Sequence, residues 1–142
     1  MDAPACAVGR LAPGGPWVGF APTLDDGYAL VVEGPGAPGR AAADADLLLA
    51  LAVAYFEDAL DAPPDELAAT HADIASLVRH VAEAEGDAAR RRLMEEAVDA
   101  IDDGLAADVV IGRLTTALST AAAGDPVAWL LERVGGVAAS HE

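Results

Sequence analysis

Cysteine, lysine, asparagine and glutamine are scarce or missing in this sequence. Cys6 is the only cysteine, which excludes an internal disulfide and favours a reducing, cytoplasmic compartment. Lysine, asparagine and glutamine do not occur at all, so every basic side chain is an arginine. This composition is typical of codon bias in a GC-rich genome, and by itself it indicates no function.

Long apolar runs are also missing. The longest uncharged apolar stretch, residues 47–56, is about half of the roughly 20 residues that a membrane-spanning helix needs. The first residues include Asp2 and carry no basic side chain before Arg10. We therefore expect neither a membrane helix nor a signal peptide.

Aromatic residues make up only 4% of the chain, whereas apolar residues make up 54%, chiefly alanine, leucine and valine. Alanine is the strongest helix former, so the composition favours α-helices that pack through aliphatic faces. The length of 142 residues predicts a single domain over 1–142, because chains of roughly 100–200 residues usually fold around one core.

The charge is strongly acidic. The formal net charge is −16, from 24 acidic and 8 basic residues. A field of this sign repels phosphate groups, so it disfavours nucleic acids and anionic membranes as partners. It favours a basic protein or a cation, and adaptation to a high-salt cytoplasm is an alternative reason for the acidity.

Residues 1–40 hold most of the prolines and glycines. Their short apolar runs predict a β-hairpin from strands over 17–21 and 28–33, to which residues 5–11 can add a third strand. Residues 34–39 read G-P-G-A-P-G, which matches the G-x-G-x-x-G spacing of dinucleotide-binding loops. The two prolines remove N–H groups that would bind a pyrophosphate, so we interpret this stretch as a loop and expect no cofactor.

From residue 41 the apolar spacing becomes that of amphipathic helices. Residues 41–135 predict a bundle of about five helices, and residues 136–142 a tail. Proline, glycine and capping residues place the helices at 42–60, 64–85, 88–103, 107–122 and 126–134. The first helix is apolar nearly all round, which places it at the centre of the bundle. The predicted fold class is therefore mostly α, with an N-terminal β-hairpin.

His71 lies on the predicted apolar face of the second helix. Histidine exchanges protons near neutral pH and binds metals, so His71 is a candidate general base or ligand-binding residue. An imidazole at the edge of the core, with one ring nitrogen bonded to a neighbour, is the commoner arrangement. His80 lies about 180° further round the helix and His141 lies in the tail. Because no metal-ligand spacing occurs, we predict no metal site.

The order of charges along residues 88–103 opposes the helix dipole, because three arginines (90–92) come first and the acids follow. Glu96, Asp99 and Asp103 are spaced by three and four residues, so they form a carboxylate stripe on one helix face. This stripe is a candidate docking site for a basic segment or a divalent cation. A solvated acidic face is the simpler interpretation.

Three aromatic side chains of the N-terminal region, Trp17, Phe20 and Tyr28, are candidate apolar anchors for a partner. Exposed aromatic residues on a short hairpin often anchor an interface. The same side chains could equally cover the helical bundle, and the sequence does not decide between the two.

These features favour a non-catalytic protein-interaction module, such as an accessory, adaptor or chaperone-like subunit. Its partner would carry a basic segment, and the hairpin or the leucine-rich helix could also form a homodimer. One alternative is a small-molecule or metal-dependent enzyme that uses His71 and nearby carboxylates. The other is an acidic mimic of nucleic acid.

Overall fold

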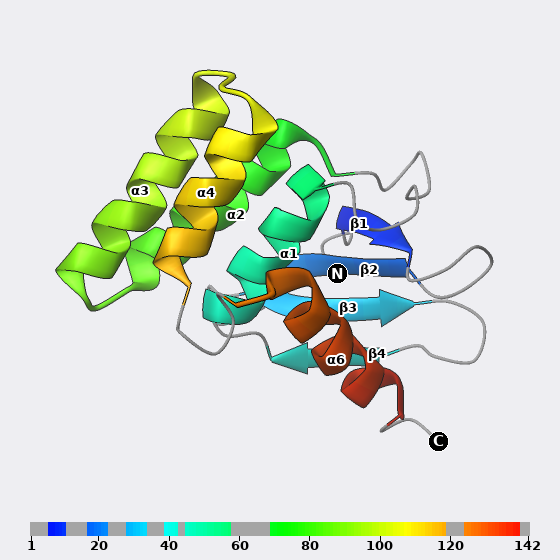
Figure 1. The fold of residues 1–142 in the computed structure, drawn as a ribbon. Helices are drawn as coiled ribbons and strands as arrows, with labels where there is room; N and C mark the ends of the chain where they lie inside the picture. The colour runs from blue at the N-terminus through cyan, green and yellow to red at the C-terminus, as the bar shows by residue number, and fades with distance from the viewer. Residues whose placement is uncertain are drawn as a thin grey trace.

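A computed structural model describes the chain over residues 6–10, 17–22, 28–33, 39–42, 45–57, 69–118 and 124–139. Within these residues four strands precede five helices (Figure 1). The fold is mostly α with an antiparallel sheet at its N-terminus, which confirms the predicted fold class. No helix in these ranges has both the length and the apolarity needed to cross a bilayer.

The sheet is an antiparallel meander in which each strand pairs with the next one along the chain. Its strands are β1 (Cys6–Arg10), β2 (Trp17–Pro22), β3 (Tyr28–Glu33) and β4 (Gly39–Ala42). The predicted hairpin is β2–β3, and β1 is the optional third strand. The register between β1 and β2 shifts between Ala7 and Gly9, which indicates a β-bulge.

The fourth strand corrects the sequence-based boundaries. Residues 34–39 were expected to form a loop and residue 42 to begin a helix, yet β4 includes both Gly39 and Ala42. Alanine and glycine have low strand propensity. The strand forms because its backbone pairs with β3, where Arg40 lies opposite Val31 and Ala41 opposite Leu30.

The two faces of the sheet are both apolar but belong to different clusters. Val18, Phe20, Leu30 and Val32 alternate along β2 and β3 and join the main core with the helices. The opposite face contributes a smaller buried cluster of Ala7, Trp17, Ala21 and Val31. A hairpin alone is marginally stable, and here helices α1 and α6 pack on the sheet.

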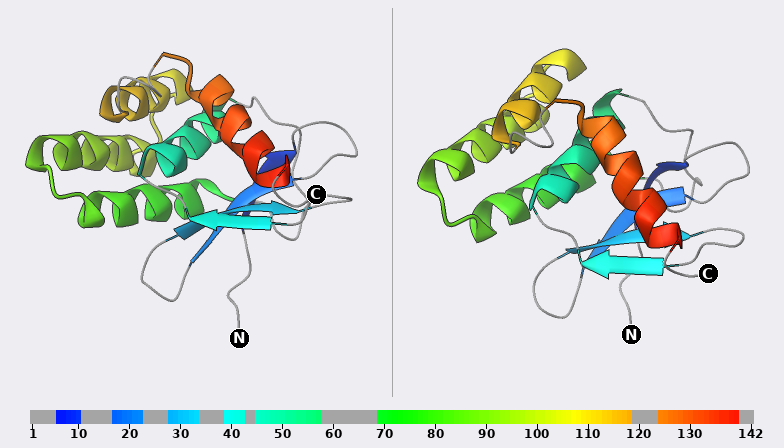
Figure 2. Two further views of the ribbon diagram at one scale, coloured as in Figure 1. Left: turned by 90° about the horizontal axis from the view of Figure 1, so that it is seen from below. Right: turned by 60° about the horizontal axis from the view of Figure 1, so that its bottom comes forward.

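Helix α1 (Ala45–Glu57) lies at the centre of the molecule, as its apolar sequence predicts. Every residue from 47 to 54 is buried, so all sides of the helix are covered. It contacts β1 and β3 on one side and α2, α4 and α6 on the others (Figures 1 and 2). It begins at Ala45 and not at residue 42, because β4 uses the preceding residues. Residues 58–60 of the predicted helix lie outside the described ranges.

Three helices complete a four-helix arrangement with α1: α2 (His71–Ala84), α3 (Ala88–Asp102) and α4 (Ala107–Ala117). Helix α2 packs on α3, α3 on α4, and both α2 and α4 pack on α1. Short connections join α2 to α3 and α3 to α4, which is typical of antiparallel bundles. Helix α3 lies on the side of the molecule away from the sheet (Figure 1).

The start of α2 differs from the prediction. A helix was expected from Pro64, which lies outside the described residues, but the capping residue is Thr70. The Thr70 hydroxyl accepts a hydrogen bond from the Asp73 N–H at 3.2 Å, and the Asp73 carboxylate accepts one from the Thr70 N–H at 2.9 Å. This reciprocal capping box satisfies N–H groups that a helix start would otherwise leave unpaired.

The boundaries of α3 follow the prediction, whereas α4 ends early. Asp87 caps α3 by accepting from the Ala89 N–H at 2.9 Å, and Gly104 after its C-terminus has a positive φ of 70°. A glycine adopts this left-handed conformation without the steric cost of a side chain. Helix α4 was expected to reach residue 122, but it ends at Ala117 and Leu118 is its C-cap.

Helix α6 (Pro126–Ala139) begins as predicted and ends later. The Asp125 carboxylate accepts a hydrogen bond from the Ala128 N–H at 3.1 Å. Gly135 and Gly136 were expected to terminate the helix and to begin a tail, but the helix continues through both. Each interior glycine costs about 1 kcal/mol relative to alanine. The packing of α6 against α1, β3 and β4 offsets that cost.

Candidate functional site

The three candidate aromatic anchors are largely covered. Trp17 is 7% exposed and belongs to the small cluster on the far face of the sheet, and Phe20 is 3% exposed in the main core. Tyr28 is half-buried against the same core. Phe20 and Tyr28 thus pack on the core that the sheet shares with the helices, whereas Trp17 packs on the opposite face of the sheet.

Tyr28 also joins the sheet to α2. Its ring makes an edge-to-face contact with Phe20 at 5.5 Å between centroids and another with His80 at 4.9 Å. Such contacts add stability beyond the buried area of the rings. His80 therefore packs against an aromatic ring on the side of α2 that faces the sheet.

His71 is the first residue of α2 and is exposed, so it does not lie on the buried face that the sequence predicts. Its Nδ1 atom lies 2.9 Å from the Tyr55 hydroxyl oxygen, within hydrogen-bond distance. Tyr55 and Phe56 both make edge-to-face contacts with the imidazole, at 5.4 and 5.2 Å. The end of α1 and the start of α2 thus meet in an aromatic cluster.

The chemistry available at this aromatic cluster is limited. Burial raises the pKa of Tyr55 above its ordinary value of 10.0, and the nearby Asp73 carboxylate raises it further. The phenol is therefore neutral at physiological pH. The Asp73 carboxylate accepts hydrogen bonds from the Thr70 backbone and hydroxyl, so it serves to cap α2.

The predicted carboxylate stripe lies on the outer side of α3. Glu96, Asp99 and Asp103 are all exposed, opposite the buried face that includes Met94 and Ile101. None of the three makes an ion pair with another residue in the described ranges. The stripe is therefore solvated, and its charges are available to a partner.

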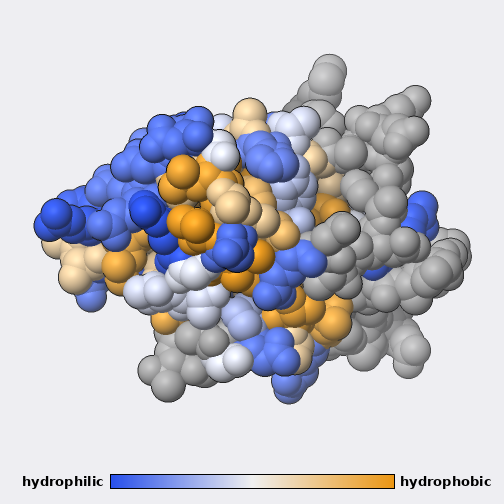
Figure 3. Space-filling model, turned by 45° about the horizontal axis from the view of Figure 1, so that its top comes forward, coloured by the Kyte–Doolittle hydropathy of each residue, from blue (hydrophilic) through white to orange (hydrophobic). Residues whose placement is uncertain are grey.

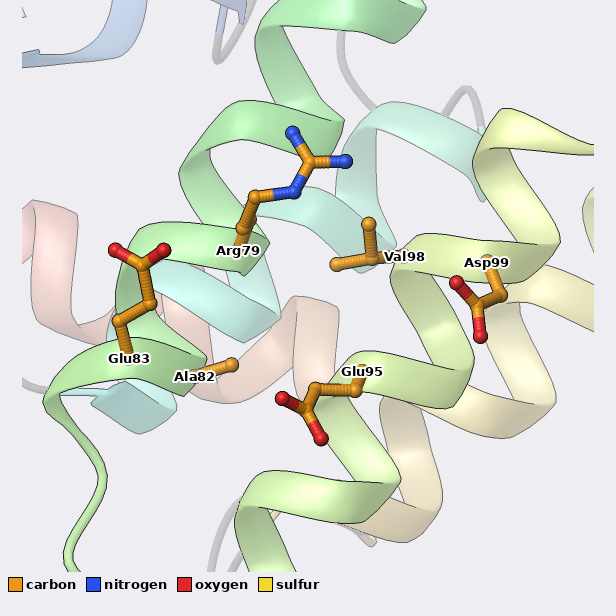
Figure 4. Close-up of a pocket in the computed structure, with 6 residues that line it drawn as sticks. All are labelled: Arg79, Ala82, Glu83, Glu95, Val98 and Asp99. Atoms are coloured by element: carbon orange, nitrogen blue, oxygen red, sulfur yellow. The ribbon is translucent and has the colours of Figure 1, made fainter.

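A surface groove between α2 and α3 adjoins the carboxylate stripe. Its volume is about 410 Å³. In Figure 4, acidic side chains project from both helices, and two small apolar side chains lie between them. Its lining residues are Arg79, Ala82, Glu83, Glu95, Val98 and Asp99.

Asp99 connects the stripe with the groove. It is the one residue of the predicted stripe that lines the groove, whereas Glu83 and Glu95 are acids that sequence reasoning did not select. The sequence does contain a pattern that points to Glu95, because Glu95 and Asp99 are spaced by four residues and therefore share a face of α3. The pairing of that face with α2 could have been inferred from the short α2–α3 connection.

Two arginines lie close to these acids, and one of them lines the groove itself. Arg79 at the groove pairs with Asp102 of α3, with 2.9 Å between Nη2 and Oδ2. Arg113 of α4 donates to the Glu96 carbonyl oxygen at 3.2 Å. Five acids have no such cationic partner within the described residues. We call them together the acidic surface: Glu83, Glu95, Glu96, Asp99 and Asp103.

Arg90 has a structural position that the sequence did not reveal. Its guanidinium pairs with Asp46 of α1, lies 3.5 Å from the Glu85 carboxylate, and donates through Nε to the Ala117 carbonyl at 3.0 Å. It thus connects α1, the α2–α3 connection and the end of α4. The neighbouring Arg91 and Arg92 are exposed and form no ion pair with the residues that the structure describes.

Metal-ligating side chains do not converge in the described part of the chain. No group of three or more histidine, cysteine, aspartate or glutamate side chains there has a geometry that could hold a metal ion.

The fold and the site together define a mostly helical domain with an acidic outer surface on α2 and α3. Comparison with known proteins adds no relative: no protein family, no curated protein and no solved structure matches this chain.

Proposed function

We propose that the protein is a non-catalytic interaction module, acting as an accessory, adaptor or chaperone-like subunit. Its acidic surface binds an arginine- or lysine-rich segment of a protein partner. The observation that carries this proposal is the groove between α2 and α3, whose lining combines a small apolar floor and Arg79, which is paired with Asp102, with three carboxylates that lack a cationic partner within the described residues.

The composition of the groove suits a long cationic side chain. Arginine and lysine carry an aliphatic stem and a charged end, and they bury the stem while the charge stays solvated or paired. Ala82 and Val98 can contact such a stem, and the carboxylates of Glu83, Glu95 and Asp99 can receive the charge. The net charge of −16 also attracts a basic segment from a distance and repels nucleic acid.

The compartment and the assembly state belong to the same proposal. A chain with one cysteine suits the reducing cytoplasm. Homodimerisation is a further expectation from the sequence, and light scattering of the purified protein measures it directly.

A binding experiment with a short arginine-rich peptide tests the proposal. We expect the double variant Glu96→Arg/Asp99→Arg to bind the peptide about tenfold more weakly at low salt, because two attractions become repulsions. Fluorescence anisotropy of the labelled peptide gives the affinity, and far-UV circular dichroism verifies that the fold is retained.

The matched control is Glu57→Arg/Glu132→Arg, which changes the net charge equally at exposed positions on α1 and α6. We expect this variant to lose less than threefold in affinity. Equal losses in the two double variants would mean that only net charge matters, and the acidic surface would then be no binding site.

A further inference from the structure

Two exposed apolar side chains stand at the start of α4. Leu105 is 42% exposed and Val109 is 39% exposed, and only Leu131 on α6 matches them among the large apolar side chains of the described ranges. They are four residues apart around the first turn of α4. Exposed apolar side chains gain free energy when a partner covers them, so their position relative to the acidic surface matters.

These side chains adjoin the carboxylate stripe of α3. Only Gly104 separates Leu105 from Asp103 along the chain, so these two residues necessarily lie close together. Arg113, one turn beyond Val109 on α4, donates to the Glu96 carbonyl across the contact between α3 and α4. In the view of Figure 3, apolar and strongly hydrophilic surfaces lie side by side on one face of the molecule.

We infer that the partner segment is a cationic amphipathic helix, an inference that rests on the proposed function. Its apolar side chains contact Leu105 and Val109, and its arginine or lysine side chains contact Glu96, Asp99 and Asp103. An amphipathic helix presents adjoining apolar and charged faces, and the α3–α4 surface presents the complementary pair. The three carboxylates follow the helical repeat of α3, so basic residues spaced by three and four on a helix lying alongside can meet them.

Two peptides of identical composition test this inference. Both contain leucine, alanine and arginine, and only one has them ordered as an amphipathic helix, while the other has the order scrambled. We expect the amphipathic peptide to bind the native protein at least fivefold more tightly, and to gain helical circular dichroism on binding.

Variants at the apolar pair provide the second measurement. Leu105→Ser/Val109→Thr should weaken binding of the amphipathic peptide about fivefold and leave binding of the scrambled peptide unchanged. Leu131→Ser, at the comparably exposed site on α6, is the control and should change neither affinity. Because all three sites are exposed, we expect the variants to fold, and circular dichroism verifies this.

The outcomes separate this inference from the proposed function. If both peptides bind equally, or if the Leu105/Val109 variant binds like the native protein, the amphipathic-helix inference is wrong while charge-driven binding stands. If neither peptide binds the native protein at low salt, both the proposed function and the inference are wrong.

Discussion

Tyr55 connects α1 with α2 through a hydrogen bond whose energetics depend on the state of its phenol. Below about pH 10 the phenol is protonated in both the folded and the unfolded chain, so the stabilisation from its neutral burial is fully present. As the pH rises further, the unfolded chain releases the proton first. The free energy of unfolding therefore falls as pH rises toward and through the raised pKa of folded Tyr55.

We predict that Tyr55→Phe makes stability decline less steeply above pH 10. Urea unfolding followed by circular dichroism, repeated across the alkaline range, measures this. The variant also loses the bond to His71, which lowers stability near neutral pH by about 1 kcal/mol. The alkaline range is unusually clean here, because the chain has no lysine to titrate.

Absorbance of the phenolate gives a direct check. The chain has two tyrosines, so Tyr28→Phe leaves Tyr55 as the only phenol that titrates. A Tyr55 midpoint at or below 10.0 would contradict the burial and the Asp73 contact described for it.

Arg90 is the residue whose replacement we expect to be most costly on the surface of α3. Arg90→Lys keeps the charge but removes the planar group that reaches Asp46, Glu85 and the Ala117 carbonyl together. We predict a loss of about 2 kcal/mol in the free energy of unfolding, measured in urea.

Arg92→Lys is the matched control for this prediction. Arg92 lies in the same turn of α3, is exposed, and forms no ion pair within the described residues. A change within about 0.5 kcal/mol is expected. If both variants lose the same stability, replacing arginine by lysine destabilises this helix at any exposed position. The contacts of Arg90 would then add no stability of their own.

At the scale of single elements, the start of α2 is set by two side chains. We predict that Thr70→Ala destabilises the protein by about 1 kcal/mol, because the first turn of α2 loses its cap. Thr116→Ala on α4 is the control: the Thr116 hydroxyl donates to the Gly112 carbonyl at 2.8 Å inside the helix, and alanine is a better helix former. Thermal unfolding compares the two, and equal midpoints would argue against the cap.

The elements that sequence analysis identified correctly carry strong local signals. Helix α3 has the capping residue Asp87 before it and Gly104 after it. Helix α1 is apolar on all sides, so it is stable only where other elements surround it, at the centre of the bundle. Strand β4 was missed because its alanines favour a helix locally, and only pairing with β3, which no local pattern encodes, makes it a strand. The length of α6 was underestimated for the same reason, since tertiary packing overrides its two glycines.

At the scale of the whole molecule, the acidic surface was only half predictable. The spacing of Glu96, Asp99 and Asp103 places them on one face of α3 from sequence alone. The groove with Glu83 and the nearness of Val109 to the stripe depend on how α2, α3 and α4 pack, which periodicity does not fix. The contacts of His71 likewise depend on the end of α1 reaching the start of α2.

The order of elements along the chain has a consequence for synthesis on the ribosome. The sheet is made first, but α6, the last described helix, packs on β3 and β4. At about 5–20 residues per second, roughly 5–20 s separate the appearance of the strands from that of α6. During that interval the part of the sheet that α6 covers in the folded protein has no covering helix, so its apolar side chains are exposed to solvent.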